Sequence, residues 1–194
     1  LDGEKAEYDY SYNYQNWYPS VEYETVNTIK NVGLFDLTPF SKFELKSDKA
    51  HIELQKICTS NIKNEVGKCT YTHMLNKDGG IETDLTVVCV SKNHFRIISS
   101  AATRERDKFH INKHLSEGIE VTDVTDEYCV FGLFGPKSRS LMEKLTGDDF
   151  SNDKFKFATS KYIKIDSKNI WIQRLSYVGE LGYELYINTP EAKK

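Results

Sequence analysis

Glycine, proline and long apolar runs are scarce in this sequence, and each shortage excludes a class of protein. With 11 glycines and 4 prolines among 194 residues, the chain is not a collagen-like repeat. Hydrophobic residues make up 39% and charged residues 28%, the composition of an ordinary globular domain rather than a coiled coil or a disordered tail. No apolar run approaches the roughly 18 residues that cross a bilayer, so we expect no membrane partner.

Cysteine is also scarce, and its spacing argues against a metal site. The four cysteines are Cys58, Cys69, Cys89 and Cys129. They form no C-x-x-C pair and no Cys/His cluster with the spacing of metal ligands. Unpatterned cysteines of this kind are typical of reduced, mostly buried thiols in a reducing compartment.

The chain has no large excess of positive or negative charge. The chain has 26 basic and 29 acidic residues, a net charge of −3, which offers no electrostatic footprint for nucleic acid. Within residues 1–20, the stretch YDYSYNYQNWYPS (8–20) alternates tyrosine with small polar residues, and such rings can stack on bases. No basic groove accompanies them, so we expect no nucleic-acid partner. We interpret residues 1–20 as a loose arm over a neighbouring surface, with disorder as the alternative.

Familiar catalytic motifs are absent as well. The sequence contains no G-x-G-x-x-G, no P-loop and no G-x-S-x-G, so we expect no dinucleotide site within this chain. His110 and His114 have the i, i+4 spacing of a zinc pair, but no glutamate of an H-E-x-x-H motif lies between them. A solvated helix face is the favoured interpretation, and we predict no metal.

What is present is a mixture of strands and helices over residues 21–194. Alternating apolar positions and turn residues predict a hairpin over 66–90 with its loop at 76–80, which ends in Gly79 and Gly80. Further strands are expected at 40–46, 94–99, 120–124, 128–133, 161–166, 169–177 and 183–188. Helices are expected at 21–30, from 47, over 101–115 and from Pro136. Because no strict βαβ alternation appears, the fold class is α+β, with antiparallel sheets and crossing helices.

The sequence also predicts an N-cap residue for one helix and the side chains that three helices bury in the core. Ser47 is a natural N-cap for the second helix. The side chains expected to point into the core are Ala50, Leu54, Ile57 and Cys58 in the second helix, Phe109 and Leu115 in the third, and Leu141, Met142 and Leu145 in the fourth.

Two carboxylates stand in apolar strands and require a reason, because burying an unpaired carboxylate is costly. Asp84 lies just past the Gly-Gly turn, and Glu184 lies between Tyr183 and Leu185. A solvent-facing strand position is the common explanation for each. With Tyr71 and Tyr177 they would form a pocket of two carboxylates and two phenols only if their hairpins converge.

Five runs of the sequence resemble the aminomethyltransferase family, the T-protein of glycine cleavage and its relatives. The runs occur in the family's order and spacing from about residue 21 to the end. They are GLFDLTPFSKFEL (33–45), YTHMLNKDGGIETDLTV (71–87), FGLFGPKSRSLMEKLT (131–146), FSNDKFKF (150–157) and SYVGELGYELYI (176–187). The resemblance implies a folate-binding domain of the T-protein fold.

Departures from the T-protein pattern point to one branch of this family. They are Thr38-Pro39-Phe40 after Leu37, Thr83 before Asp84, and the run 176–182. All three resemble the C-terminal half of the flavin-dependent sarcosine and dimethylglycine dehydrogenases. The tyrosine-rich segment also resembles the link between their flavin and folate halves. The chain lacks a start methionine and a signal peptide, so we expect a piece of a longer protein, with an FAD domain before Leu1 and a β-rich domain after the last residue.

The resemblance assigns roles to individual residues. Asp84 matches the family's essential aspartate beside the reacting edge of folate, and Glu184 matches the glutamate that hydrogen-bonds the pterin. Tyr71 and Tyr177 match tyrosines that line the pterin pocket. Ser100 stands where T-proteins often carry asparagine.

Phe40 stands where T-proteins carry a methionine that touches the pterin.

The implied reaction transfers a one-carbon unit from an iminium to tetrahydrofolate, after a flavin elsewhere in the polypeptide has oxidised an N-methyl amine. The implied locations are the bacterial cytoplasm or the mitochondrial matrix. Two alternatives stay open: a stand-alone aminomethyltransferase, and a non-catalytic folate-binding or regulatory relative.

Overall fold

Side-chain alternation along the strands builds two facing sheets in the computed structural model, which describes residues 7–192. In strand β5 (His94–Ser99), Phe95 and Ile97 are fully buried on one face, whereas Ile98 contributes to a core on the other. In β10 (Gly182–Asn188), Tyr183 and Leu185 likewise face one core and Tyr186 another. Each of these strands therefore separates two apolar cores.

All strand pairs within residues 7–192 are antiparallel, as the α+β prediction required. Sheet A has the order β1-β7-β10-β9-β8, and sheet B has the order β3-β4-β5-β2-β6. The remaining strands of sheet A are β1 (Gly33–Asp36), β7 (Tyr128–Phe134), β8 (Thr159–Ile165) and β9 (Lys168–Arg174). Those of sheet B are β2 (Ser41–Lys46), β3 (Cys69–Leu75), β4 (Ile81–Ser91) and β6 (Thr122–Asp123).

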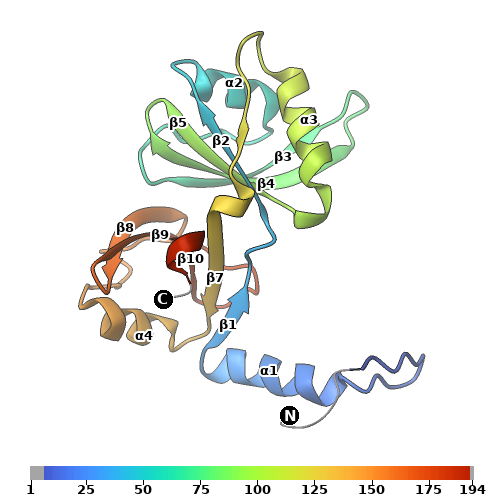
Figure 1. The fold of residues 1–194 in the computed structure, drawn as a ribbon, viewed down its shortest axis with the longest axis vertical. Helices are drawn as coiled ribbons and strands as arrows, with labels where there is room; N and C mark the ends of the chain where they lie inside the picture. The colour runs from blue at the N-terminus through green and yellow to red at the C-terminus, as the bar shows by residue number, and fades with distance from the viewer. Residues whose placement is uncertain (1–6, 193–194) are drawn as a thin grey trace.

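Helices cover the outer face of each sheet (Figure 1). Helices α2 (Ala50–Ile57) and α3 (Arg104–His114) pack on sheet B, and α4 (Ser138–Thr146) packs on sheet A. The core between the two sheets includes Val88 from sheet B and Trp171 from sheet A. The layers are thus helices, sheet B, sheet A, helix. Short 3-10 turns lie at Ala101–Thr103, Thr125–Glu127 and Thr189–Glu191.

The chain crosses between the sheets twice, through residues 37–40 after β1 and through residues 124–127 before β7. The first crossing brings Phe40 to the edge of the space between the sheets, where it packs against the inter-sheet core. The first crossing contributes Leu37, Pro39 and Phe40 to the wall of the candidate site.

The N-terminal segment stands apart from the two sheets (Figure 1). Helix α1 (Tyr18–Lys30) begins three residues before its predicted start. In the described part of the arm, Tyr8 and Tyr10 pack edge-on against Trp17, with ring centroids 5.1 and 5.4 Å away. The described part of the arm therefore packs on its own tryptophan. Residues 1–6 of the predicted arm lie outside the described residues.

Two of the expected core positions and one cap are wrong. Phe109 is 69% exposed, because α3 packs through Asp107 and Ile111, and a residue two positions from each lies on the opposite side of a helix. Leu145 is 50% exposed because it lies near the end of α4, where it lines a shallow groove with Leu34 on the outside of sheet A.

The predicted N-cap at Ser47 lies too far from its helix. Helix α2 starts at Ala50 with Lys49 at the cap position, so the Ser47 hydroxyl accepts only from the Lys49 backbone N–H, at 3.2 Å. Ser47 therefore closes the turn that precedes the helix. Other predicted core residues are confirmed: Ala50, Leu54, Cys58 and Met142 are buried, and Ile57, Leu115 and Leu141 pack against the cores.

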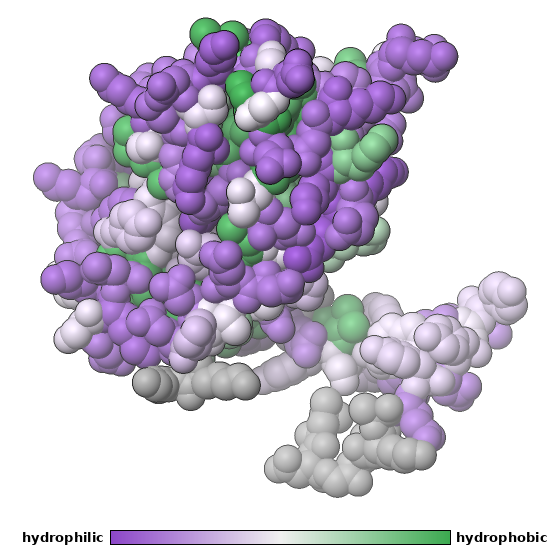
Figure 2. All heavy atoms as spheres, turned by 45° about the horizontal axis from the view of Figure 1, so that its top comes forward, coloured by the Kyte–Doolittle hydropathy of each residue, from purple (hydrophilic) through white to green (hydrophobic). Residues whose placement is uncertain are grey.

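The surface in Figure 2 is largely hydrophilic, with apolar side chains in small separate patches. The helices formed by residues 7–192 include none long and apolar enough to span a membrane. The four cysteines are free thiols.

Candidate functional site

A cavity of about 870 Å³ opens between the two sheets. Strands β3, β4 and β5 of sheet B form one side, and β7 and β10 of sheet A, with the loops at 36–40 and 175–177, form the other. All six sequence-predicted site residues line it: Phe40, Tyr71, Asp84, Ser100, Tyr177 and Glu184. The convergence of the hairpins, which the local sequence pattern left open, is present in the structure.

Asp84 and Tyr71 form a hydrogen-bonded pair on sheet B. In the β3–β4 ladder Asp84 pairs with His73, and Tyr71 pairs with Thr86, so Asp84 and Tyr71 are diagonal neighbours on one face. The Tyr71 hydroxyl donates to Oδ2 of Asp84 at 3.0 Å. This hydrogen bond raises the pKa of Tyr71, so the phenol stays protonated as a donor at neutral pH. Both side chains are exposed toward the cavity mouth.

The backbone beneath Asp84 is tied to helix α3. Thr83 points to the opposite face of β4 and donates to the fully buried Asp107 at 3.1 Å. Thr103 donates to the same carboxylate oxygen at 2.7 Å. Because Asp107 joins β4 to the start of α3, it fixes the position of the strand that carries Asp84.

Ser100 lies on the cavity wall, but its hydroxyl has a structural contact. The hydroxyl oxygen accepts from the backbone N–H of Ala102 at 3.3 Å and caps the turn at 101–103. The Ser41 hydroxyl donates to the Ser100 carbonyl at 3.0 Å. Ser100 therefore shapes the wall by holding this turn.

Glu184 and Tyr186 form a second pair, on sheet A. The Tyr186 hydroxyl donates to Oε2 of Glu184 at 3.0 Å. Burial raises the pKa of Glu184, and the hydrogen bond from Tyr186 partly opposes that shift. Burial and the neighbouring carboxylate raise the pKa of Tyr186 well above its ordinary value. Glu184 thus presents a half-buried carboxylate held by one phenol.

Aromatic rings form flat walls at the mouth of the cavity. Phe40 and Tyr177 meet edge to face with ring centroids 5.7 Å apart, and Phe157 lines the opening as well. Tyr177 is 72% exposed and Phe157 67%, so both present ring surface that a planar ligand can cover.

The cavity also contains residues that the sequence interpretation missed, namely Asp36, Thr86, Phe157 and Tyr186. Strand alternation would have found Tyr186, because it lies two positions from Glu184 on the same face. Phe157 lies in a loop, where no periodicity reveals orientation.

The charge of the lining is one-sided. Asp36, Asp84 and Glu184 contribute carboxylates, and the described lining residues include no lysine, arginine or histidine. Such a lining disfavours an anionic group and favours a ligand that is neutral or positive and offers N–H donors. The cavity suits a flat heterocycle with a donor-rich edge.

Residues 7–192 contain no group of three or more His, Cys, Asp or Glu placed to hold a metal ion. The ring centroids of His110 and His114 are 4.5 Å apart, and Nδ1 of His114 lies 2.8 Å from the His110 carbonyl oxygen.

The fold and the cavity together define an α+β protein in which two antiparallel sheets enclose a site of small-molecule size. The model of the GCVT N-terminal domain family matches residues 3–194, so the chain belongs to this family. The predicted family resemblance and fold class are confirmed.

Similar proteins of known activity are enzymes. The chain is 35% identical over 187 residues to mitochondrial dimethylglycine dehydrogenase of Rattus norvegicus, covering 95% of this chain and 22% of that protein. It is 34% identical to the formaldehyde-forming 4-methylaminobutanoate oxidase of Paenarthrobacter nicotinovorans, again over 95% of this chain and 22% of the relative. The aminomethyltransferase of Natranaerobius thermophilus is 30% identical, with 92% and 50% covered. The chain therefore spans about a fifth of the length of the first two proteins and half of the third.

Solved structures share the fold. The glycine cleavage aminomethyltransferase of Bartonella henselae superposes with a TM-score of 0.78 at 20% identity, over 96% of this chain and 51% of that one. A chain of the heterotetrameric sarcosine oxidase of Corynebacterium superposes with a TM-score of 0.62 at 13% identity, over 88% and 85%.

Proposed function

We propose that this chain is the tetrahydrofolate-binding part of a flavin-dependent dehydrogenase of N-methylglycines, such as sarcosine or dimethylglycine. In this function the chain transfers a one-carbon unit from an iminium to tetrahydrofolate, which yields 5,10-methylenetetrahydrofolate and releases the demethylated amine. Of the two N–H protons that the folate loses, one ends on the amine nitrogen and the other leaves to the protein or solvent. The observation that carries the proposal is the convergence of two carboxylate–phenol pairs on one cavity between the sheets. The flavin is assigned to another part of the protein, as in the resemblance that the sequence shows.

The residues of the cavity fit a reduced folate. Its pterin ring is flat, matches the aromatic walls and has an edge with two parallel N–H donors. A carboxylate such as that of Glu184 accepts two such donors, and each hydrogen bond to a charged group contributes about 1.5–3 kcal/mol. The acidic lining excludes the anionic glutamate tail, so the tail points out of the cavity. Tetrahydrofolate would supply the nucleophilic nitrogen that accepts the one-carbon unit.

Asp84 acts at the reacting centre in this proposal. Its carboxylate is fixed by Tyr71 and lies on the opposite sheet from Glu184, so a ring held at Glu184 extends toward it. Positive charge that develops near Asp84 during transfer is stabilised by the negative carboxylate. The same charge favours the approach of a cationic iminium. Asp84 also provides an acceptor for the proton that must leave the reacting nitrogen.

Replacing Asp84 with asparagine tests this function. In the complete protein, Asp84→Asn should leave amine oxidation near its wild-type rate and reduce formation of 5,10-methylenetetrahydrofolate by about 10²–10³-fold, because a pre-oriented charge is lost. Free formaldehyde should accumulate instead, even with saturating tetrahydrofolate. Both products are measured in the same reaction. Formation of 5,10-methylenetetrahydrofolate at the wild-type rate in the variant would falsify the role of Asp84.

A stand-alone aminomethyltransferase is the second candidate, and the similarity to enzymes of that name supports it. The nucleotide sequence that encodes the region before Leu1 distinguishes the two. A strand followed by G-x-G-x-x-G favours the dehydrogenase, whereas a nearby start codon favours the aminomethyltransferase.

A further inference from the structure

Tyr186 lines the candidate site next to Glu184 and is almost completely buried. It follows Glu184 by two positions in β10, so both side chains face the space between the sheets. Tyr186 is only 2% exposed, and its hydroxyl donates to Oε2 of Glu184 at 3.0 Å. Tyr186 is the donor to the Glu184 carboxylate within the described part of the chain.

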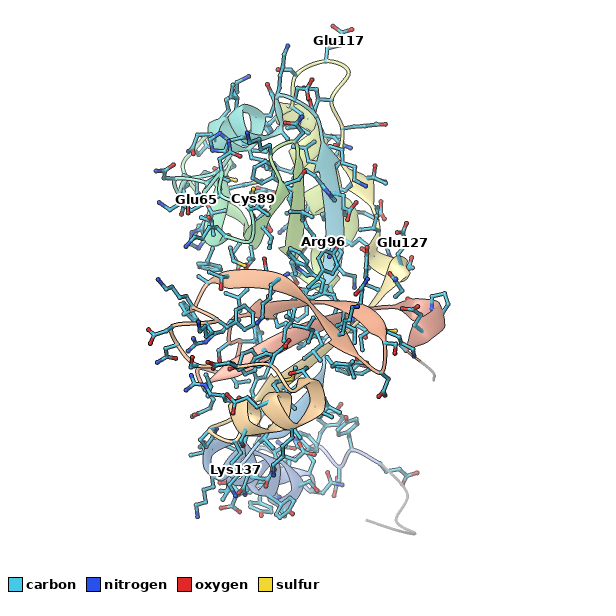
Figure 3. The ribbon with its side chains drawn as sticks, turned by 90° about the vertical axis from the view of Figure 1, so that its left-hand side faces the viewer. Glu65, Cys89, Arg96, Glu117, Glu127 and Lys137 are labelled. Atoms are coloured by element: carbon cyan, nitrogen blue, oxygen red, sulfur yellow. The ribbon has the colours of Figure 1, made fainter. Side chains whose placement is uncertain are left out.

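The ring of Tyr186 is held from the other sheet by Arg96. The guanidinium carbon of Arg96 lies 5.9 Å from the ring centroid of Tyr186 and 4.5 Å from that of Tyr128. Arg96 is itself fixed by a hydrogen bond of 2.7 Å to Glu44, and Figure 3 shows it where the two sheets meet. A buried cation against a ring face resists displacement of that ring. The phenol of Tyr186 therefore has little freedom to leave Glu184.

Resting on the proposed function, we propose that Tyr186 is a positioning residue that keeps the Glu184 carboxylate charged and aimed at the donor edge of bound tetrahydrofolate. Glu184 recognises two N–H donors only as a carboxylate, because the protonated acid presents an O–H donor on one oxygen. Burial favours the neutral acid, and the hydrogen bond from Tyr186 opposes this. Without the phenol, more of the protein carries the neutral acid, and one oxygen loses its fixed direction.

Other titratable groups lie around the pair formed by Glu184 and Tyr186. The titratable groups that interact with the pair or line the same cavity are Cys69, Arg96, Asp36, Tyr71, Asp84 and Tyr177. Burial raises the pKa of Cys69 to about 12, so this thiol is neutral at pH 7. Tyr186 is therefore the group that most directly stabilises the charged form.

The test is a titration of the complete protein with tetrahydrofolate at pH values from 5.5 to 9. Tyr186→Phe should weaken binding about tenfold at pH 7, the size of one hydrogen bond to a charged group. It should also shift the acidic limb of the binding profile to higher pH. Tyr183→Phe is the matched control. Tyr183 is fully buried on the same strand, faces the opposite core, and its hydroxyl has no hydrogen-bond partner in residues 7–192. This control should bind as the wild type does.

A double-mutant cycle separates positioning from a general effect on structure. In the Glu184→Gln background, Tyr186→Phe should cost much less affinity than in the wild type, because Tyr186 acts through the carboxylate. A wild-type affinity and pH profile in Tyr186→Phe, or an equal loss in both backgrounds, would overturn the inference. Undiminished binding in Glu184→Gln would instead refute the proposed recognition by Glu184, and the inference with it.

Discussion

The two carboxylate–phenol pairs have the same hydrogen-bond length and different surroundings. Tyr71 donates to Asp84, and Tyr186 donates to Glu184, each at 3.0 Å. The first pair is exposed at the mouth of the cavity on sheet B, whereas Tyr186 is buried and Glu184 half-buried on sheet A. Burial raises the pKa of Glu184 and strengthens each hydrogen bond that it makes to a ligand.

This difference suits the pairs to different tasks. A half-buried carboxylate with a fixed direction favours recognition, because water competes less for its oxygens. An exposed carboxylate at the mouth can meet an incoming cation and pass a proton to solvent. We therefore assign binding mainly to Glu184 and the chemical step mainly to Asp84. The first two predictions below test that division, and the third tests the electrostatic environment of Glu184.

The largest expected contrast is in affinity for tetrahydrofolate. Glu184→Gln removes the charge that accepts the pterin donors and should weaken binding by about 10–100-fold, which corresponds to about 1.4–2.7 kcal/mol. Asp84→Asn should change affinity by about threefold or less, since its effect belongs to the transition state. Equilibrium titration of both variants at pH 7.5 checks this. Equal losses of affinity would erase the division of roles.

A smaller effect is expected at Tyr71. Tyr71→Phe removes the donor that orients Asp84 but leaves its charge, so the transfer rate should fall by about 2–10-fold, the range of one ordinary hydrogen bond. Tyr162→Phe is a suitable control, because Tyr162 is an exposed tyrosine on β8 outside the cavity. Single-turnover measurement of methylene transfer compares the two. A loss as large as that of Asp84→Asn would give Tyr71 a direct part in the reaction.

The smallest expected effect is on stability as a function of pH, and it contrasts Glu184 with Glu44. Glu184 has a folded-state pKa above its ordinary value of 4.5, so its contribution to stability is full below that value and is lost as pH rises through the folded pKa. Burial alone would raise the pKa of Glu44, but hydrogen bonds from His94, Lys46 and Arg96 lower it far below that value. Its contribution is therefore present above pH 4.5 and is lost as pH falls.

Denaturant unfolding between about pH 2 and 8 measures both contributions, because the Glu44 contribution changes below pH 4.5 and the Glu184 contribution changes above it. Relative to wild type, Glu184→Gln should gain stability as pH rises, and Glu44→Gln should lose it. Parallel curves for the two variants would show that the two environments do not differ as described.

Much of the fold follows from local patterns in the sequence. Gly79 and Gly80 locate the β3–β4 turn, and the helical patterns identify buried positions such as Leu54 and Met142. Helix α3 shows where such patterns fail. Its buried face includes the polar Asp107, so the search for an apolar stripe selected Phe109, which is exposed. Hydrogen bonds from Thr83 on β4 and from Thr103 at the start of α3 compensate the burial of Asp107, and no helical period encodes the tertiary one from Thr83.

The candidate site was predictable only in part. Asp84 and Tyr71 share a hairpin, so their proximity follows from strand register. Glu184 belongs to the other sheet, and its approach to Asp84 depends on how the two sheets pack, which periodicity does not describe. The resemblance to known proteins supplied that pairing. Tyr186 was missed because a tyrosine in an apolar strand is a common core residue, although alternation places it beside Glu184.

A crystal structure of the complete protein with bound tetrahydrofolate tests the central claim most directly. We predict the pterin ring in the cavity between the sheets, with its N–H edge within hydrogen-bond distance of both Glu184 oxygens and its reacting nitrogen beside Asp84. The glutamate tail should leave through the opening near Phe157. A folate bound elsewhere, or bound in the cavity with its tail rather than its ring against Glu184, would contradict the account.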